Sequence, residues 1–180
     1  MPFWAWIVLV AGVIALAAGA TLGGIYAYRA AERRLLLQLV RSREGLEFVR
    51  QALGDSLVRI AEGSEQELRV FADDPDSVER RALAEVASRA RLLADELDVT
   101  ALPKSLIPAG EALADAAFVI AREAGRVGED AAGDAAIEAL GCIDLEAVEQ
   151  YYRAAVSAVR SACETCGLED SAVYGGGLYL

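Results

Sequence analysis

The sequence predicts an all-α protein in which a single N-terminal transmembrane helix precedes an antiparallel cytoplasmic bundle of about four helices. The run from Phe3 to Tyr28 contains no charged residue, although 25% of the chain is charged. Beyond this run, apolar residues recur at intervals of three, four and seven, which is the spacing of one helix face. No segment shows the alternation of apolar and polar residues that is typical of a half-buried strand.

The uncharged run is long enough to cross a bilayer, because a spanning helix needs about 20 apolar residues. Ala18–Ala20 resembles a signal-peptide cleavage site. No basic residue precedes the run, however, and its apolar stretch is too long for such a peptide, so we expect a retained anchor. Aromatic side chains favour the headgroup level of a membrane. Those expected to act as interface anchors at the two ends are Trp4, Trp6, Tyr26 and Tyr28.

Arginines follow the uncharged run directly, and we expect Arg29, Arg33 and Arg34 to lie at the membrane surface. By the positive-inside rule, the N-terminus lies outside an inner or plasma membrane and residues from about 29 onward are cytoplasmic. Residues 29–60 carry a charge of +3 and the rest of the chain −14, within a total of −11. Such a basic segment suits an anionic bilayer, whereas the acidic body argues against a nucleic-acid partner.

Small residues recur at every fourth position of the uncharged run. They are Ala11, Ala15, Gly19, Gly23 and Ala27. A stripe of this kind lets two helix backbones approach closely in lipid. It predicts a transmembrane interface with a partner's helix or with a second copy, which would give a membrane-attached homo-oligomer. The competing interpretation is that the stripe reflects only the abundance of Ala and Gly in this run.

The expected organisation has four parts. They are a transmembrane anchor at 1–28, a long juxtamembrane helix at 29–62, an acidic bundle domain at 63–170 that packs with residues 35–62, and a flexible tail at 171–180.

Apolar residues repeat at every seventh position in the juxtamembrane helix, at Leu39, Leu46, Leu53 and Ile60. Because Ser42 and Ser56 interrupt the second core position, this repeat favours one face of an intramolecular bundle over a free coiled coil.

Helix boundaries follow from caps and prolines. Gly63 is a candidate break, and Asp74 followed by Pro75 predicts the N-cap and first position of a helix that runs to about Asp98. Two prolines indicate a loop at Asp98–Pro108, and a shorter helix follows from about Ala109 to Val127. The last long helix is expected to begin near Asp144 and to end at Gly167, a natural C-cap residue.

The chain lacks the residues that most catalytic mechanisms need. Histidine is absent, which removes the commonest general base and the commonest metal ligand. No glycine-rich loop follows a strand and opens a helix, as a phosphate site requires. Carboxylates are plentiful, but we expect them on solvated helix faces. The sequence therefore predicts no enzyme, no cofactor and no small-molecule substrate.

The three cysteines are Cys142, Cys163 and Cys166, and the last two form a CxxC motif. A redox CxxC normally opens a helix, whereas this one closes a helix, where the dipole raises a thiol pKa. A helix between Cys142 and Cys163 would hold them roughly 30 Å apart, which argues against three converging thiolate ligands. We expect buried, inert thiols. Cys163 and Cys166 remain weak metal candidates, for a redox or metal sensor or a zinc bridge between two copies.

The segment Tyr151–Val156 resembles the aromatic-rich motif on the last helix of LemA-type membrane proteins. The predicted outward N-terminus, single span and helical cytoplasmic body resemble the same family. The chain lacks that family's Arg-Arg-x-Asp-Leu-Ile-Pro-Asn segment after the anchor, and Leu106–Pro108 is only a partial match in another place. We therefore assign no family from this resemblance.

Together these features predict a non-enzymatic, single-pass membrane protein that acts as a scaffold or accessory subunit through helix-mediated protein–protein interaction. Its expected partners are the lipid bilayer and another protein, or itself. The tail ends in Leu178–Leu180, which is either a docking peptide or simply part of a flexible end.

Overall fold

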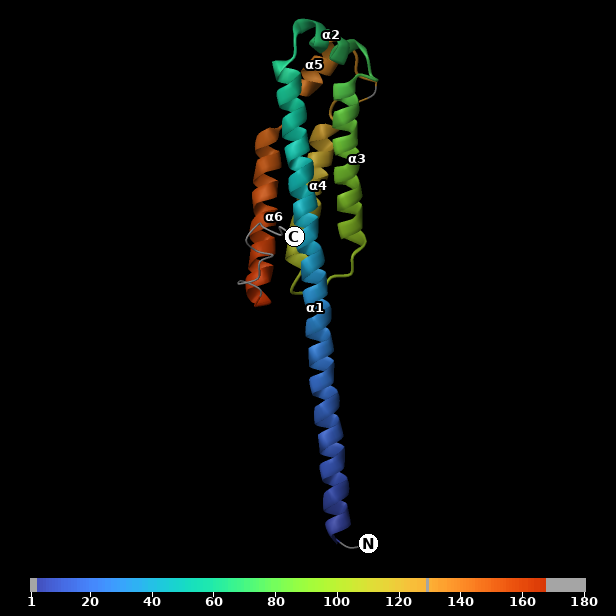
Figure 1. Cartoon of the computed structure of the whole chain (residues 1–180), viewed down its shortest axis with the longest axis vertical. Helices are drawn as coiled ribbons and strands as arrows, with labels where there is room; N and C mark the ends of the chain where they lie inside the picture. Colours follow the sequence, from blue (N-terminus) through green and yellow to red (C-terminus); the bar gives the residue numbers. More distant parts are fainter. Residues whose placement is uncertain (1–2, 129, 168–180) are drawn as a thin grey trace, which may run out of the picture. The chain divides into compact units, whose positions relative to one another are not determined.

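The computed structural model describes the backbone of residues 3–128 and 130–167, and the side chains from Tyr26 onward within those ranges. Over these residues the chain forms six α-helices and no strand, so the predicted all-α fold is confirmed (Figure 1). The helices are α1 (Phe3–Glu62), α2 (Glu65–Asp73), α3 (Val78–Val99), α4 (Ile107–Ala124), α5 (Asp134–Gly141) and α6 (Leu145–Thr165). The chain divides into an N-terminal unit, Met1–Leu37, and a bundle unit, Gln38–Leu180.

The bundle unit is built from four long helices, which are the C-terminal part of α1 together with α3, α4 and α6 (Figure 1). Helix α4 packs against both α3 and α6. An ion pair between Arg50 and Glu149 joins α1 to α6, and a contact between Phe48 and Arg89 joins α1 to α3. The short helices α2 and α5 pack together at one end, where Gly133 donates its N–H to the carbonyl of Ala72 at 2.9 Å.

The apolar repeat of α1 is buried in the bundle unit, and Leu39, Leu46 and Leu53 are each at most 1% exposed. The two serines that interrupt the repeat are buried as well. Ser42 donates its hydroxyl to the carbonyl of Gln38 at 3.2 Å, and Ser56 donates to that of Ala52 at 2.7 Å. Because each hydroxyl is satisfied by its own helix, neither needs a polar partner from elsewhere in the core.

Of two local predictions, one was confirmed and one was wrong. The helix breaks at Gly63 as predicted, between the end of α1 and the start of α2. Ser64 accepts the N–H of Glu67 and the Glu67 carboxylate accepts the N–H of Ser64, a capping box that starts α2. Asp74 and Pro75 do not start α3. They form a turn in which Ser77 donates to the Asp74 carbonyl at 3.1 Å, with proline at the turn position that suits its fixed φ.

Over the part of the chain that the structure describes, no helix has an apolar stretch long enough to cross a membrane. The predicted transmembrane helix therefore has no support in the structure. Residues 3–25 of the run that carries this prediction, Phe3 to Tyr28, lie outside the residues whose side chains are described.

A buried carboxylate fixes the start of α6. Glu123 on α4 has no exposed surface, and its carboxylate accepts the backbone N–H of Asp144 at 3.0 Å. Arg122 and Arg126 form ion pairs with the same carboxylate. Asp144 in turn caps α6 by accepting the N–H of Ala147 at 2.9 Å. One side chain thus links the end of α4 to the predicted N-cap of the last helix.

We expect Glu123→Ala to lower the free energy of unfolding by about 2 kcal/mol, because it removes the buried carboxylate that accepts the N–H of Asp144. Chemical denaturation followed by circular dichroism measures the change. The matched control is Glu85→Ala, which removes an exposed ion pair with Arg89 and is expected to cost less than about 0.5 kcal/mol. Equal losses in the two variants would contradict this role for Glu123.

Candidate functional site

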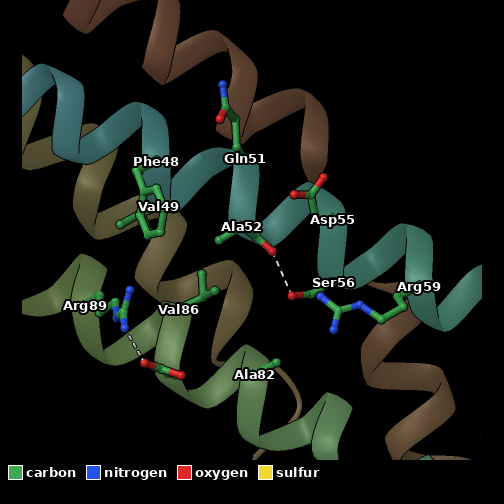
Figure 2. A pocket seen from close by; sticks show the side chains of 11 residues that line it. Phe48, Val49, Gln51, Ala52, Asp55, Ser56, Arg59, Ala82, Val86 and Arg89 are labelled. Carbon is green, nitrogen blue, oxygen red and sulfur yellow. Dashed lines mark hydrogen bonds and ion pairs between the residues drawn. The ribbon is translucent and has the colours of Figure 1, made fainter.

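The candidate site is a hollow of about 270 Å³ between α1 and α3, which we name the α1–α3 groove (Figure 2). Both helices belong to the bundle unit over this stretch. The lining residues of α1 are Phe48, Val49, Gln51, Ala52, Asp55, Ser56 and Arg59, and those of α3 are Ala82, Glu85, Val86 and Arg89. The α1 residues recur at intervals of three and four, so they occupy one face of that helix.

Small side chains create the hollow. Ala52 and Ser56 of α1 and Ala82 of α3 line it, and none of them is large enough to fill the space between the two helices. The floor is apolar, because Val49 and Val86 are each only 6% exposed. The Ser56 hydroxyl is turned back onto the Ala52 carbonyl (Figure 2). The groove therefore offers an apolar base with no unsatisfied hydroxyl in it.

The rim combines an exposed ring with charged side chains. Phe48 is 57% exposed, and the guanidinium of Arg89 lies 5.9 Å from the centre of its ring, within the range of a cation–π contact. Arg89 also pairs with Glu85 across one turn of α3. Asp55 and Arg59 have no ion pair among the described residues. The rim thus presents one aromatic side chain and two opposite charges to a binding partner.

A polar cluster joins α1 to α6. The Glu47 carboxylate accepts the guanidinium N–H groups of Arg50, and this hydrogen bond is the largest of the effects that lower the pKa of Glu47 to about 2. Arg50 also pairs with Glu149 at 3.2 Å and lies 4.7 Å from the ring centre of Tyr152. Burial, followed by its hydrogen bond to Glu47, raises the pKa of Tyr152 to about 12.

The pKa values of Glu47, Glu123 and Tyr152 bear on whether these groups suit proton transfer in catalysis. Burial alone would raise the pKa of Glu123, but hydrogen bonds from Arg126, the Asp144 N–H and Arg122 outweigh it and hold that pKa at about 2. Glu47 and Glu123 therefore stay ionised, and Tyr152 stays protonated, across the neutral range. A general acid or base works best with a pKa near the working pH. Both clusters consequently suit a structural role.

The three cysteines do not form a site in the described residues. Cys142 is exposed at the end of α5, and Cys163 is buried near the end of α6. Burial, with a smaller effect of the neighbouring Cys166, raises the pKa of Cys163. Helix α6 has 21 residues, so it separates Cys142 from Cys163 by roughly 30 Å. No group of three His, Cys, Asp or Glu residues in the described part of the chain could hold a metal ion.

The membrane-related site residues fall into two sets. Within the described part, Ala27, Tyr26, Tyr28, Arg29, Arg33 and Arg34 are exposed. The other predicted interface and anchor residues, Trp4, Trp6, Ala11, Ala15, Gly19 and Gly23, lie outside the residues whose side chains are described. Their roles stay predictions.

Sequence reasoning missed the α1–α3 groove. Phe48 does carry a signal, because it lies off the buried seam of α1, next to Val49, where a solvated helix is expected to carry a polar residue. The pairing of its face with Ala82 and Val86 depends on which helices become neighbours. Periodicity within one helix does not contain that information.

We expect a maleimide to modify Cys142 at least about tenfold faster than Cys163 in the folded protein, because Cys142 is exposed whereas burial both shields Cys163 and raises its pKa. Peptide mass spectrometry over a time course measures both rates. In guanidinium the two rates should converge. Rapid modification of Cys163 in the folded protein would reopen the sensor hypothesis.

We expect stability to fall as the pH drops from about 4.5 towards about 2. The pKa values of Glu47 and Glu123 are about 2 in the folded protein against 4.5 ordinarily, so their ionised forms stabilise the fold above that window. The melting temperature as a function of pH measures this. The double variant Glu47→Gln, Glu123→Gln should melt lower at neutral pH and lose less on acidification, and an unchanged acid dependence would contradict the assignment.

Comparisons with models of known protein families, with curated proteins and with solved structures found no match to this chain. Its function is accordingly inferred from its own residues.

Proposed function

We propose that this protein is a non-enzymatic, membrane-anchored scaffold or accessory subunit that binds a helix of a partner protein in the α1–α3 groove. The observation that carries the proposal is the groove itself, with Phe48 exposed at its rim above a floor of Val49 and Val86. Aromatic side chains are enriched in protein interfaces, where they fill apolar pockets of the partner.

The size and form of the groove favour a helix over a small molecule. Its volume of about 270 Å³ is below the 300–1,000 Å³ that is usual for small-ligand sites. Its walls are two antiparallel helices, and the ridge of a third helix packs naturally between such walls. Asp55 and Arg59 offer one negative and one positive contact, so we expect the partner helix to carry the complementary pair, which would set its direction.

The membrane anchor is proposed from the sequence. The uncharged run from Phe3 to Tyr28 has the length and the aromatic ends of a span, and Arg29, Arg33 and Arg34 follow it. With the N-terminus outside, the bundle unit lies in the cytoplasm. The partner is then either another membrane protein or one recruited to the cytoplasmic surface.

Two competing functions are less well supported. A thiol-based metal or redox sensor needs a reactive or metal-bound Cys163, whereas burial raises the pKa of that thiol. A self-assembling oligomer built on the stripe from Ala11 to Ala27 rests on sequence spacing alone. The absence of histidine and the pKa values of Glu47 and Glu123 argue against an enzyme.

Photo-crosslinking in native membranes tests the groove directly. The photoreactive residue p-benzoylphenylalanine replaces Phe48 in one variant and Phe118 in another. Phe118 is a matched control, because it is a phenylalanine on α4 that is 61% exposed against 57% for Phe48. We expect a specific adduct with a second polypeptide from position 48 only, since that position borders the groove.

Two results would contradict the proposal. One is the absence of any adduct at position 48 while the protein is present in the membrane fraction. The other is the same set of adducts at both positions, which would indicate non-specific collision. An adduct between position 48 and a second copy of this chain would indicate that the groove binds another copy of the same protein and not a different partner.

A further inference from the structure

The loop between α3 and α4 differs from the rest of the acidic bundle unit. Residues 99–110, which run from the last residue of α3 through the loop to the first turn of α4, contain no acidic residue, and their one charge is Lys104, the only lysine of the chain. Lys104 is exposed. Val99, the last residue of α3, is 81% exposed, more than any other large apolar side chain in the described part of the chain. Ile107, the first residue of α4, is 38% exposed.

The loop has a defined shape that holds these side chains outward. Leu106 is fully buried and donates its N–H to the Pro103 carbonyl at 2.8 Å, and Ile107 donates to the same carbonyl at 3.2 Å. Leu102 packs onto α4 so closely that a Cβ on Gly110 would lie 2.2 Å from its Cδ1 atom. Two leucines thus tie the loop to the bundle, while Val99 and Lys104 stay in solvent.

The packing of α1 on α3 shows which end of the bundle unit carries the loop. Phe48 contacts Arg89, and Arg59 lines the same hollow as Glu79, so the two helices run antiparallel. Ten residues beyond Arg89 is Val99, and ten residues before Phe48 is Gln38. The loop therefore lies at the end of the bundle unit where the chain enters at Gln38, opposite α2 and α5 (Figure 1).

We propose that this loop is a second membrane contact, which rests on the surface of a bilayer that contains anionic lipid. The inference rests on the proposed anchor, because only nine residues of the chain lie between Tyr28 and Gln38. Val99 provides apolar contact with the headgroup region, and Lys104 pairs with lipid phosphate. Arg41, exposed at the same end on α1, adds a further positive charge.

The acidic residues that border the loop limit the contact to its tip. Asp98, Glu111 and Asp115 line a hollow beside it, on the flank of α3 and α4. An anionic surface would repel this flank, so the bundle unit would meet the lipid with Val99 and Lys104 first. A contact of this kind fixes the tilt of the bundle unit and with it the direction in which the α1–α3 groove faces.

The single lysine makes the test specific. The full-length protein carrying Arg81→Lys, which introduces one exposed amine near the other end of α3, is reconstituted in nanodiscs and treated with a water-soluble acetylating reagent. Peptide mass spectrometry gives the acetylation rate at position 104 relative to that at position 81. We expect this ratio to be about fivefold lower in phosphatidylcholine–phosphatidylglycerol discs than in detergent, as an interaction of about 1 kcal/mol requires.

Val99→Asp is the second variant. Its site is exposed, so folding should be unaffected, and the added charge should restore the detergent ratio in anionic discs. If the acetylation ratio of the Arg81→Lys protein is the same in anionic discs as in detergent, the loop contact is overturned, whereas the proposed anchor is unaffected. Equal slowing in pure phosphatidylcholine discs would overturn the role of anionic lipid. Failure to co-elute with the discs would overturn the anchor, and the loop contact with it.

Discussion

The burial of one face of α1 is the constraint on which the rest of the bundle unit depends. Leu39, Leu46, Leu53 and Ile60 are between 0% and 6% exposed. Burial of each contributes roughly 1.5–3 kcal/mol, so together they match the whole net stability of a typical domain. The surface ion pairs are worth about 1 kcal/mol or less each. The seam therefore decides that α1 is a wall of the bundle, and the groove exists because its neighbouring face meets α3.

Helix α1 carries both the proposed membrane anchor and one wall of the groove. Its N-terminal part carries the uncharged run, and its C-terminal part supplies Phe48, Ala52 and Asp55 to the groove. Polar clusters hold the surrounding helices in place. Glu123 fixes the start of α6, and Glu47 with Arg50 links α1 to α6. These ionisable groups have pKa values shifted away from neutrality, as expected where charge stabilises a fold and takes no part in proton transfer.

Much of the fold could be predicted from the sequence, because helix periodicity and caps are local. Asp144 was predicted as the N-cap of the last helix, and it is. Helix α2 was missed because Ser64 and Glu67 form a capping box whose short helix carries little periodicity. Pro75 suits a helix start and a turn equally well. The structure has the turn, because the Asp74 carbonyl accepts the N–H of Ser77. The groove could not be predicted, because it depends on small side chains of two helices that meet only in the folded chain.

Native mass spectrometry of the protein, extracted from its own membranes in mild detergent, tests the central claim most directly. A scaffold that holds a partner helix in the α1–α3 groove predicts a mass that contains one stoichiometric second polypeptide. Ala52→Trp, which fills the groove from its base, should release that polypeptide and leave the protein folded, because the hollow has room for a larger side chain. A bare monomer from native membranes, or a complex that Ala52→Trp leaves intact, would contradict the account.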